Sequence, residues 1–397
     1  MIADVVVVGG GPAGAVVSTL LARRGRSVVL VERAEAYRWR ACGVFSSPAT
    51  VAFLRDLGLD RDLLAQVARG APAMRVETAG GVRFRLTYGD DGTLTAPAVS
   101  FDRSVLDPAL LDLAWSAGAD VRTGTTAELV EAGRLTVRDA AHEAAIEAPV
   151  IVGADGLRSV VARAFGVVRP ARLERRIGLT FHVRDPRPDA PRDARMITFR
   201  GGYVGLAPVP GGRVNVGIVL GPAWAARLRD EGAERTVAAV LAGVPVADDD
   251  PVDWHAPEHC DSIEGASPLG HRVARRAGDG WLLVGDAAGF LDPFTGEGLH
   301  RALVSARLAA EAIDRRLAGD LGALPACDRA MTARFRSKDA VSLVVQAFLA
   351  RPAAFEYVAR RLVARNGVRE TMGLVMGDLV PATRALDPRF VATLLRP

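Results

Sequence analysis

A glycine-rich run near the start of the chain has the residue types and spacing that bind a dinucleotide. Gly9-Gly10-Gly11-Pro12-Ala13-Gly14 fits the GxGxxG pattern. In it Gly9 permits a tight turn, Gly11 lets a pyrophosphate approach the backbone, and Gly14 lets a helix pack closely on a strand. The amides and partial positive charge at the start of that helix favour phosphate. We therefore predict that Gly9, Gly11, Pro12, Ala13 and Gly14 bind a dinucleotide cofactor.

Glu32 ends the strand that follows this turn and helix. A carboxylate at that place suits the two ribose hydroxyls of an adenosine, and it would repel a 2′-phosphate. The site should therefore hold NAD or FAD and not NADP, and this motif alone does not decide between the two. We assign the nearby Arg33 and Arg40 to the same cofactor site.

Short apolar runs predict the elements that position these residues. Residues 3–8 are β-branched and uninterrupted, as in a parallel strand buried on both faces, and 13–24 and 27–32 complete a βαβ unit. Alternating residues at 178–183 and 214–218, together with 75–86, predict a separate antiparallel sheet. Further predicted elements are a loop at 34–48, helices at 104–117 and 298–317, strands at 119–123, 149–153 and 281–286, and a mostly helical region at 325–395.

Two distant motifs decide which cofactor is expected. A strand runs into Gly153-Ala154-Asp155-Gly156, and another runs into Gly285-Asp286-Ala287-Ala288-Gly289. With the glycine run they occur in the order found in the FAD-binding oxidoreductases of the p-hydroxybenzoate hydroxylase fold, which the chain resembles over roughly residues 1–320. The resemblance implies an α/β fold, in which a Rossmann-like FAD-binding domain carries an inserted antiparallel β-sheet substrate domain and a helical C-terminus.

The same resemblance implies where these regions begin and end. The expected boundaries are FAD-binding parts at 1–75, 101–174 and 271–320, substrate-domain strands at 76–100, a substrate sheet at 175–270, and a helical C-terminal region at 321–397.

The resemblance also implies roles for single residues around FAD. Asp286, next to Gly285, would bond a ribityl hydroxyl. The amides at 296–298 would face the flavin N1/O2 edge, where reduced flavin carries negative charge. Arg103 would lie near the FAD phosphates, and Asp155 would have a structural role around the cofactor or dinucleotide path. The remaining residues assigned to the cofactor by this resemblance are Pro293, Gly296, Glu297, Gly298 and Cys42.

Within that group, the chain looks most like the geranylgeranyl reductases. The segments 292–298 and 40–43 match those reductases, and Gly289 stands where aromatic hydroxylases usually have histidine. Tyr203 begins a region similar to their Tyr-x-Trp-x-Phe-Pro segment, but Gly205 replaces the Trp and Ala207 the Phe. We predict Cys42 and Tyr203 as catalytic residues, with Arg40 able to lower the pKa of Cys42 or to hold a substrate anion.

The resemblance implies reduction, or in reverse dehydrogenation, of a carbon–carbon double bond in a hydrophobic organic substrate. The alternatives are an NAD(P)H-dependent flavin monooxygenase and a flavin-binding protein without turnover. Because the chain has one glycine fingerprint, NADH or NADPH would visit the flavin transiently. The only lysine is Lys338, which excludes mechanisms that need an earlier lysine, such as flavin-dependent halogenation. The sequence leaves the oligomeric state open.

Composition excludes several other classes. The net charge is +4, but the basic residues form no stripe, so nucleic acid is not an expected partner. The three cysteines are far apart, which indicates no zinc site or disulfide framework and fits a reducing cytoplasm. The uncharged stretch 5–22 is interrupted by glycines and Pro12, which argues against a membrane span.

Three further features have competing interpretations. His255 and His259 are spaced to bind metal best on a helix, which Pro257 disfavours, so we expect loop histidines and no metal. His300 could face the cofactor or simply pack on its helix. The apolar and arginine-containing stretch 340–363 suits a packed helix pair, a lid over the substrate, or a peripheral membrane contact.

Overall fold

The computed structural model describes residues 1–397 except 38, 89–96, 172–174, 246–249 and 397. Within these ranges, six strands form a first sheet, in the order β20-β21-β12-β1-β2-β8. All neighbours are parallel except β20 and β21. The strands are β1 (Val5–Val8), β2 (Val28–Val31), β8 (Asp120–Arg122), β12 (Val150–Gly153), β20 (Ala277–Gly278) and β21 (Trp281–Leu283).

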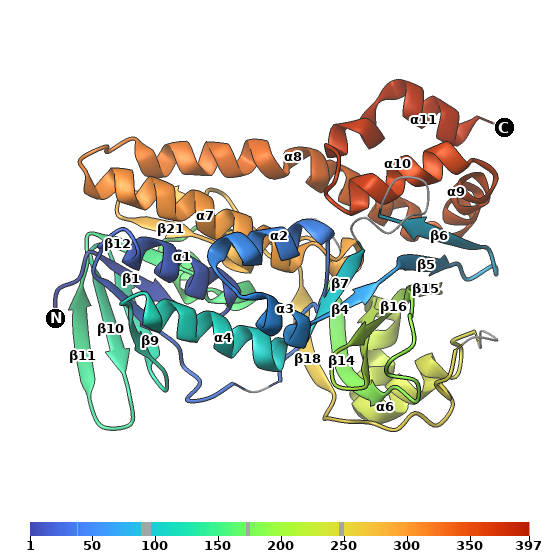
Figure 1. Cartoon of the computed structure of the whole chain (residues 1–397), viewed down its shortest axis with the longest axis horizontal. Helices are drawn as coiled ribbons and strands as arrows, with labels where there is room; N and C mark the ends of the chain where they lie inside the picture. Colours follow the sequence, from blue (N-terminus) through green and yellow to red (C-terminus); the bar gives the residue numbers. More distant parts are fainter. Residues whose placement is uncertain (38, 89–96, 172–174, 246–249, 397) are drawn as a thin grey trace.

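The valines of β1 alternate between two buried faces of this sheet. Val5 and Val7 pack with the helices α1 (Pro12–Ala22), α4 (Arg103–Ser116) and α7 (Gly298–Leu317). Val6 and Val8 pack instead against a small antiparallel sheet, which the sequence analysis did not anticipate (Figure 1). That sheet consists of β9 (Thr126–Glu131), β10 (Arg134–Arg138) and β11 (Glu143–Glu147). Burial on both faces explains the uninterrupted apolar sequence of the strand.

A second sheet, seven-stranded over the described residues, has the order β18-β14-β17-β16-β15-β5-β6. One face packs on helix α6 (Pro222–Leu241), and the other is turned toward a cavity and the C-terminal helices. The expectation of a wholly antiparallel sheet is wrong at one place, because β5 pairs in parallel with β15. The strands are β5 (Ala73–Glu77), β6 (Arg83–Thr87), β14 (Arg176–Arg184), β15 (Ala194–Phe199), β16 (Gly202–Val209), β17 (Arg213–Leu220) and β18 (Glu264–Leu269).

Short elements connect the two sheets. The remaining strands are β3 (Phe45–Ser46), β4 (Ala68–Ala71) and β7 (Ala98–Phe101), which form a small sheet, and the pair β13 (Val168–Arg169) and β19 (Arg272–Val273). The remaining helices before the C-terminal region are α2 (Pro48–Leu57), α3 (Arg61–Val67) and α5 (Val160–Ala164), with 3₁₀ turns at Gly156–Arg158, Gly285–Ala288 and Pro293–Thr295. The fold class expected from the sequence is confirmed.

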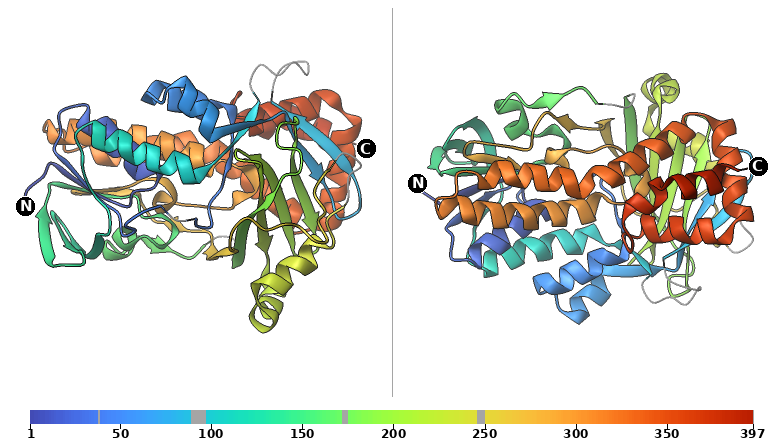
Figure 2. Two further views of the ribbon diagram at one scale, coloured as in Figure 1. Left: turned by 60° about the horizontal axis from the view of Figure 1, so that its bottom comes forward. Right: turned by 90° about the horizontal axis from the view of Figure 1, so that it is seen from above.

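The C-terminal region is helical, as predicted. Helix α8 (Ala323–Leu349) lies along α7, and the later helices cover one end of the second sheet (Figure 2). These are α9 (Pro352–Ala364), α10 (Asn366–Met376) and α11 (Pro388–Leu395), with a 3₁₀ turn at Ala382–Leu386. Phe355, Val358 and Leu362 of α9 pack on the β5–β6 end of that sheet.

No single helix in the described part of the chain is both long and apolar enough to cross a membrane. Helices α8 and α9 pass that test of length and composition only when taken together, and they are bent by 116° where they meet.

Candidate functional site

The glycine turn between β1 and α1 has a geometry that only glycine permits. Gly9 has φ +105°, and a Cβ there would lie 2.5 Å from the carbonyl oxygen of Ala154. A Cβ on Gly14 would lie 1.9 Å from the Gly9 carbonyl oxygen, whereas one on Gly11 would meet only open space. No side chain caps the first turn of α1. The open space at Gly11 and the uncapped amides fit the phosphates of a dinucleotide.

Glu32 lies buried at the end of β2 and stabilises this turn. Its carboxylate accepts hydrogen bonds from the amides of Gly10 (2.8 Å) and Ala34 (3.0 Å) and from Nη2 of Arg40 (2.9 Å). Burial raises the pKa of Glu32, but these bonds outweigh it and hold the pKa below its usual value. The carboxylate is therefore ionised at neutral pH. Arg33, the next residue, is exposed.

A cavity of about 320 Å³ extends from the glycine turn to the second sheet. Its far end is apolar and includes Met74, Met196, Leu269 and Phe294. The predicted site residues that line it are Gly11, Pro12, Ala13, Cys42, Arg103, Tyr203, Gly285, Asp286, Pro293, Gly296 and Gly298. The predicted residues outside this lining are Gly9, Gly14, Glu32, Arg33, Arg40, Asp155 and Glu297.

Asp286 and Arg103 are the charged groups of the predicted site that line the cavity. Burial raises the pKa of Asp286 to about 6, an effect that Arg103 and Arg301 partly oppose. Arg103 itself donates to both carboxylate oxygens of Asp107 (2.6 and 2.8 Å) and to the carbonyl of Gly43 (2.9 Å). It thus attaches helix α4 to the loop that carries Cys42.

Cys42 lines the cavity with a protonated thiol. Burial raises its pKa to about 11, although Arg103 and, to a smaller extent, Arg40 lower it. Arg40 thus lowers this pKa in the expected direction, but its guanidinium bonds to Glu32 and burial dominates at the sulfur, so the thiol stays protonated. A thiol in this state has a proton to donate at neutral pH.

Tyr203 is buried in a hydrogen-bonded network at the apolar end. Its hydroxyl donates to Oδ1 of Asp292 (2.6 Å), and its ring lies edge-on to Phe294. Asp292 also accepts from Arg176 (2.8 Å) and Gln346 (2.7 Å). Burial raises the pKa of Tyr203 well above its usual value, so the hydroxyl stays neutral.

Helix α8 holds the segment 292–297 at both ends. Gln346 bonds Asp292, and two turns earlier the Nζ of Lys338 lies 3.4 Å from Oε1 of Glu297 and 2.8 Å from Oδ1 of Asp378. Burial raises the pKa of Glu297 to about 7, against the lowering effect of Lys338. Glu297 therefore lies behind the lining glycines 296 and 298 and supports them from outside the cavity.

Several predicted or candidate residues have structural contacts instead. Asp155 accepts the amide of Val160 (2.5 Å) at the start of α5, so its carboxylate anchors that helix. His300 is buried with Nδ1 3.5 Å from Oγ1 of Thr50, which places it in the packing between α7 and α2. His259 stacks on Phe181. Over the described residues, no group of three or more His, Cys, Asp or Glu side chains is placed to hold a metal.

A polar group that the sequence analysis missed lies beside the cavity. Thr180 and Asn215 line it from β14 and β17, and His182 lies behind them, paired with Asp261 at 2.6 Å. The alternation of strand β14 was a usable signal, because it places 178, 180 and 182 on one face. The partner Asp261 lies in a separate loop and had no local signal.

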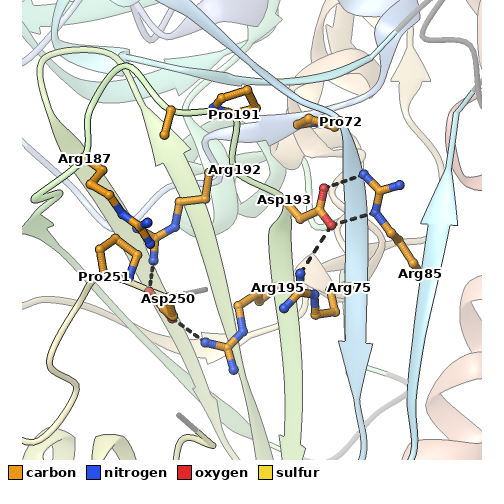
Figure 3. A pocket seen from close by; sticks show the side chains of 11 residues that line it. Pro72, Arg75, Arg85, Arg187, Pro191, Arg192, Asp193, Arg195, Asp250 and Pro251 are labelled. Carbon is orange, nitrogen blue, oxygen red and sulfur yellow. Dashed lines mark hydrogen bonds and ion pairs between the residues drawn. The ribbon is translucent and has the colours of Figure 1, made fainter. Parts of the chain in front are cut away.

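A separate cleft of about 410 Å³ is rich in arginine and is lined by residues of and around β5, β6 and β15 (Figure 3). The carboxylate of Asp193 accepts hydrogen bonds from both Nε and Nη2 of Arg85 (2.7 and 2.8 Å). Arg195 donates to Glu77 (2.7 Å) and Asp250 (2.5 Å), and all three side chains are almost completely buried. These ion pairs connect β5, β6 and the start of β15. Arg195 also belongs to the lining of the main cavity.

Known proteins are similar to this chain over most of its length. A protein-family model described as FAD binding domain matches residues 2–322. The chain is 29% identical over 327 residues to the menaquinone reductase of Mycolicibacterium smegmatis, covering 78% of this chain and 76% of the relative. It is 30% identical over 330 residues to digeranylgeranylglycerophospholipid reductase 1 of Methanopyrus kandleri, covering 78% and 79%.

A solved structure gives a comparable match. The flavin-dependent halogenase CmlS superposes with a TM-score of 0.76 at 25% identity, over 85% of this chain and 63% of the halogenase. The chain therefore spans less than two thirds of that enzyme.

Proposed function

Since the chain belongs to the FAD binding domain family, we propose that this FAD-dependent oxidoreductase reduces a carbon–carbon double bond in a hydrophobic, isoprenoid-like substrate, or oxidises the product in reverse. The observation that carries the proposal is the largely apolar cavity, which continues directly from the glycine turn. Two reductases whose names specify menaquinone and an isoprenoid phospholipid are about 30% identical over most of the chain.

The residues present fit FAD along the length of the site. The turn at 9–14 would hold the pyrophosphate, Glu32 the adenosine ribose, and Asp286 a ribityl hydroxyl. The amides at 296–298 would lie at the flavin N1/O2 edge. When bound, FAD supplies a reversible carrier of a hydride equivalent. NADH or NADPH is the proposed transient electron donor.

Replacing Glu32 with alanine tests the cofactor assignment. We expect the affinity for FAD to fall by at least about 10- to 100-fold, because even one lost charge-assisted bond to the ribose contributes about 1.5–3 kcal/mol, and the Gly10 amide also loses its acceptor. The dissociation constant can be measured by titrating apoprotein with FAD. Glu35→Ala, the loss of an exposed glutamate three residues further on, is the control, and wild-type affinity in Glu32→Ala would contradict the assignment.

Reduction also requires that a nearby acid or water deliver a proton to the second carbon of the double bond. Cys42 is the proposed donor, because its thiol lines the cavity and remains protonated. The Tyr203 hydroxyl already donates to Asp292, so we propose that Tyr203 orients the substrate and shapes the apolar end. Neither role requires a lysine, and Lys338 is buried beside Glu297 and Asp378, outside the cavity lining.

A hydrophobic substrate of this class dissolves in membranes, and the C-terminal helices offer a surface for peripheral contact. Tyr357, Val363, Val391 and Leu395 of α9 and α11 are exposed. Residues 351–396 contain eight arginines and four acidic residues. Apolar side chains among basic residues are typical of surfaces that bind anionic lipid headgroups.

The mass change of the product tests the reaction type. Incubation of the FAD-loaded enzyme with a reduced nicotinamide and a polyprenyl or menaquinone-type substrate should add two hydrogen atoms to the product. In the reverse direction two hydrogens should be lost. Mass spectrometry under ¹⁸O₂ separates the alternatives, because incorporation of one labelled oxygen would instead identify a monooxygenase.

A further inference from the structure

One face of the second sheet carries a row of polar groups in an otherwise apolar region. On β14, Thr180 lies in the cavity wall and His182 follows on the same face. On the neighbouring β17, Asn215 pairs in register with His182 and also lines the cavity. Thr180, His182 and Asn215 are between 4% and 6% exposed, so their hydrogen bonds must be satisfied inside the protein or by a ligand.

Asp261 determines which ring nitrogen of His182 carries hydrogen. Its carboxylate lies 2.6 Å from Nδ1 and also accepts the backbone amide of His182 at 2.7 Å. A carboxylate can only accept, so Nδ1 is the donor. Burial lowers the pKa of His182, an effect that Asp261 and Asp102 oppose and Arg213 reinforces. The ring is therefore neutral at neutral pH, and Nε2 is an acceptor.

The orientation of Asn215 follows from that acceptor. Its amide nitrogen Nδ2 lies 3.4 Å from Nε2 of His182 and 3.1 Å from Oγ1 of Thr180, and it donates one hydrogen to each. The amide oxygen Oδ1 then faces the Gly217 side, 4.0 Å from where a Cβ on that glycine would lie. No hydrogen-bond partner for Oδ1, or acceptor for the Thr180 hydroxyl hydrogen, is present in the part of the chain that the structure describes.

From these contacts we propose that Asn215 and Thr180 form a specificity site for a hydroxyl group, or a group of the same donor–acceptor pattern, on the substrate. The Thr180 hydroxyl donates to the ligand oxygen, and Asn215 Oδ1 accepts the ligand hydrogen. His182 and Asp261 are positioning residues that prevent Asn215 from turning its nitrogen toward the cavity.

Two glycines leave space for the ligand beside this pair. Gly205 and Gly217 are paired across β16 and β17, and both line the cavity. A Cβ at either position would find no atom closer than 3.6 Å. The wall next to the polar pair is therefore flat backbone that a chain or ring can lie against.

This inference rests on the proposed function, because it assumes that the cavity is the substrate site. It can be tested by measuring binding alone, without turnover. Binding to the FAD-loaded enzyme can be followed through the flavin absorbance with two matched pairs of probes. The pairs are geranylgeraniol with geranylgeranyl methyl ether, and 2-naphthol with 2-methylnaphthalene. We expect the hydroxyl probe to bind about 10-fold or more tightly in at least one pair, because the other probe leaves buried polar groups unpaired.

Variants decide whether this preference comes from the proposed residues. Asn215→Leu and Thr180→Val should bring the affinity ratio close to one, whereas Thr180→Ser should keep it. Thr198→Val is the matched control, since that buried threonine of β15 bonds the backbone near Glu77 and does not line the cavity.

The outcomes also separate this inference from the proposed function. The absence of a hydroxyl preference in both pairs, or a preference that survives in Asn215→Leu, would overturn the inference. A preference seen only with the naphthalene pair, without binding of either isoprenoid, would support the polar site while contradicting an isoprenoid substrate.

Discussion

Replacing Cys42 with alanine should lower turnover by about 10²–10⁴ while FAD stays bound, the usual range for removing a general acid. The thiol lines the cavity, and its pKa is raised to about 11. Because the raised pKa keeps the proton on sulfur as the pH increases, the contribution of Cys42 should persist through neutral pH and decline only as the pH approaches 11. Single-turnover oxidation of reduced enzyme by substrate, followed across pH, measures this contribution directly.

Cys260→Ala provides the control for this experiment, because that cysteine is exposed and lies outside the cavity lining. A modest change in Cys42→Ala with an altered flavin spectrum would indicate that the thiol only shapes the cavity. Wild-type rate, spectrum and substrate affinity would remove Cys42 from the site. So would a structure of the FAD complex with the sulfur more than about 10 Å from the flavin ring, which is beyond the reach of a proton donor.

Arg195→Leu should destabilise the fold by about 3–5 kcal/mol, as expected when one partner of a buried ion pair is removed. The guanidinium donates to Glu77, to Asp250 and to the carbonyl of Pro245, and the side chain is only 5% exposed. Its loss leaves the Glu77 carboxylate without this buried partner. It also removes one partner from Asp250 (Figure 3). The shift can be measured by urea unfolding at a fixed, saturating FAD concentration.

Arg85 in the same cleft offers a matched control. Its side chain is 50% exposed and pairs with Asp193 near the surface, so Arg85→Leu should cost at most about 1 kcal/mol. A second mutation, Glu77→Gln in the Arg195→Leu background, should restore part of the loss by removing one uncompensated charge. Equal effects of the two arginine variants would show that burial does not govern this cluster.

The parts of the fold that depend on neighbouring residues could be predicted from the sequence. Gly14 is required for a local steric reason, because a Cβ there would meet the carbonyl oxygen of Gly9 in the same turn. The uninterrupted valines of β1 predict burial on both faces. The match of three motifs then identified FAD as the expected cofactor. The structure brings Gly11, Asp286 and Gly296 into one cavity although they are far apart in the chain.

The parts that depend on distant partners could not be predicted. Arg40 lies two residues before Cys42, yet its guanidinium bonds Glu32, because the anion there attracts it more strongly than a protonated thiol does. His182 and Asp261 meet only through the pairing of the second sheet and the loop before β18, and β5 reaches β15 from an earlier part of the chain.

The contacts of helix α8 with the segment 292–297 affect how this protein can exchange parts with its relatives. The family match ends at residue 322, one residue before α8 begins, yet Lys338 and Gln346 of that helix support the expected flavin edge. A recombined gene that joined this N-terminal part to the tail of another homologue would lose both supports unless the new tail supplied equivalent side chains. Residues 292–297 and helix α8 are therefore expected to be inherited as one unit, even though the boundary of the sequence family falls between them.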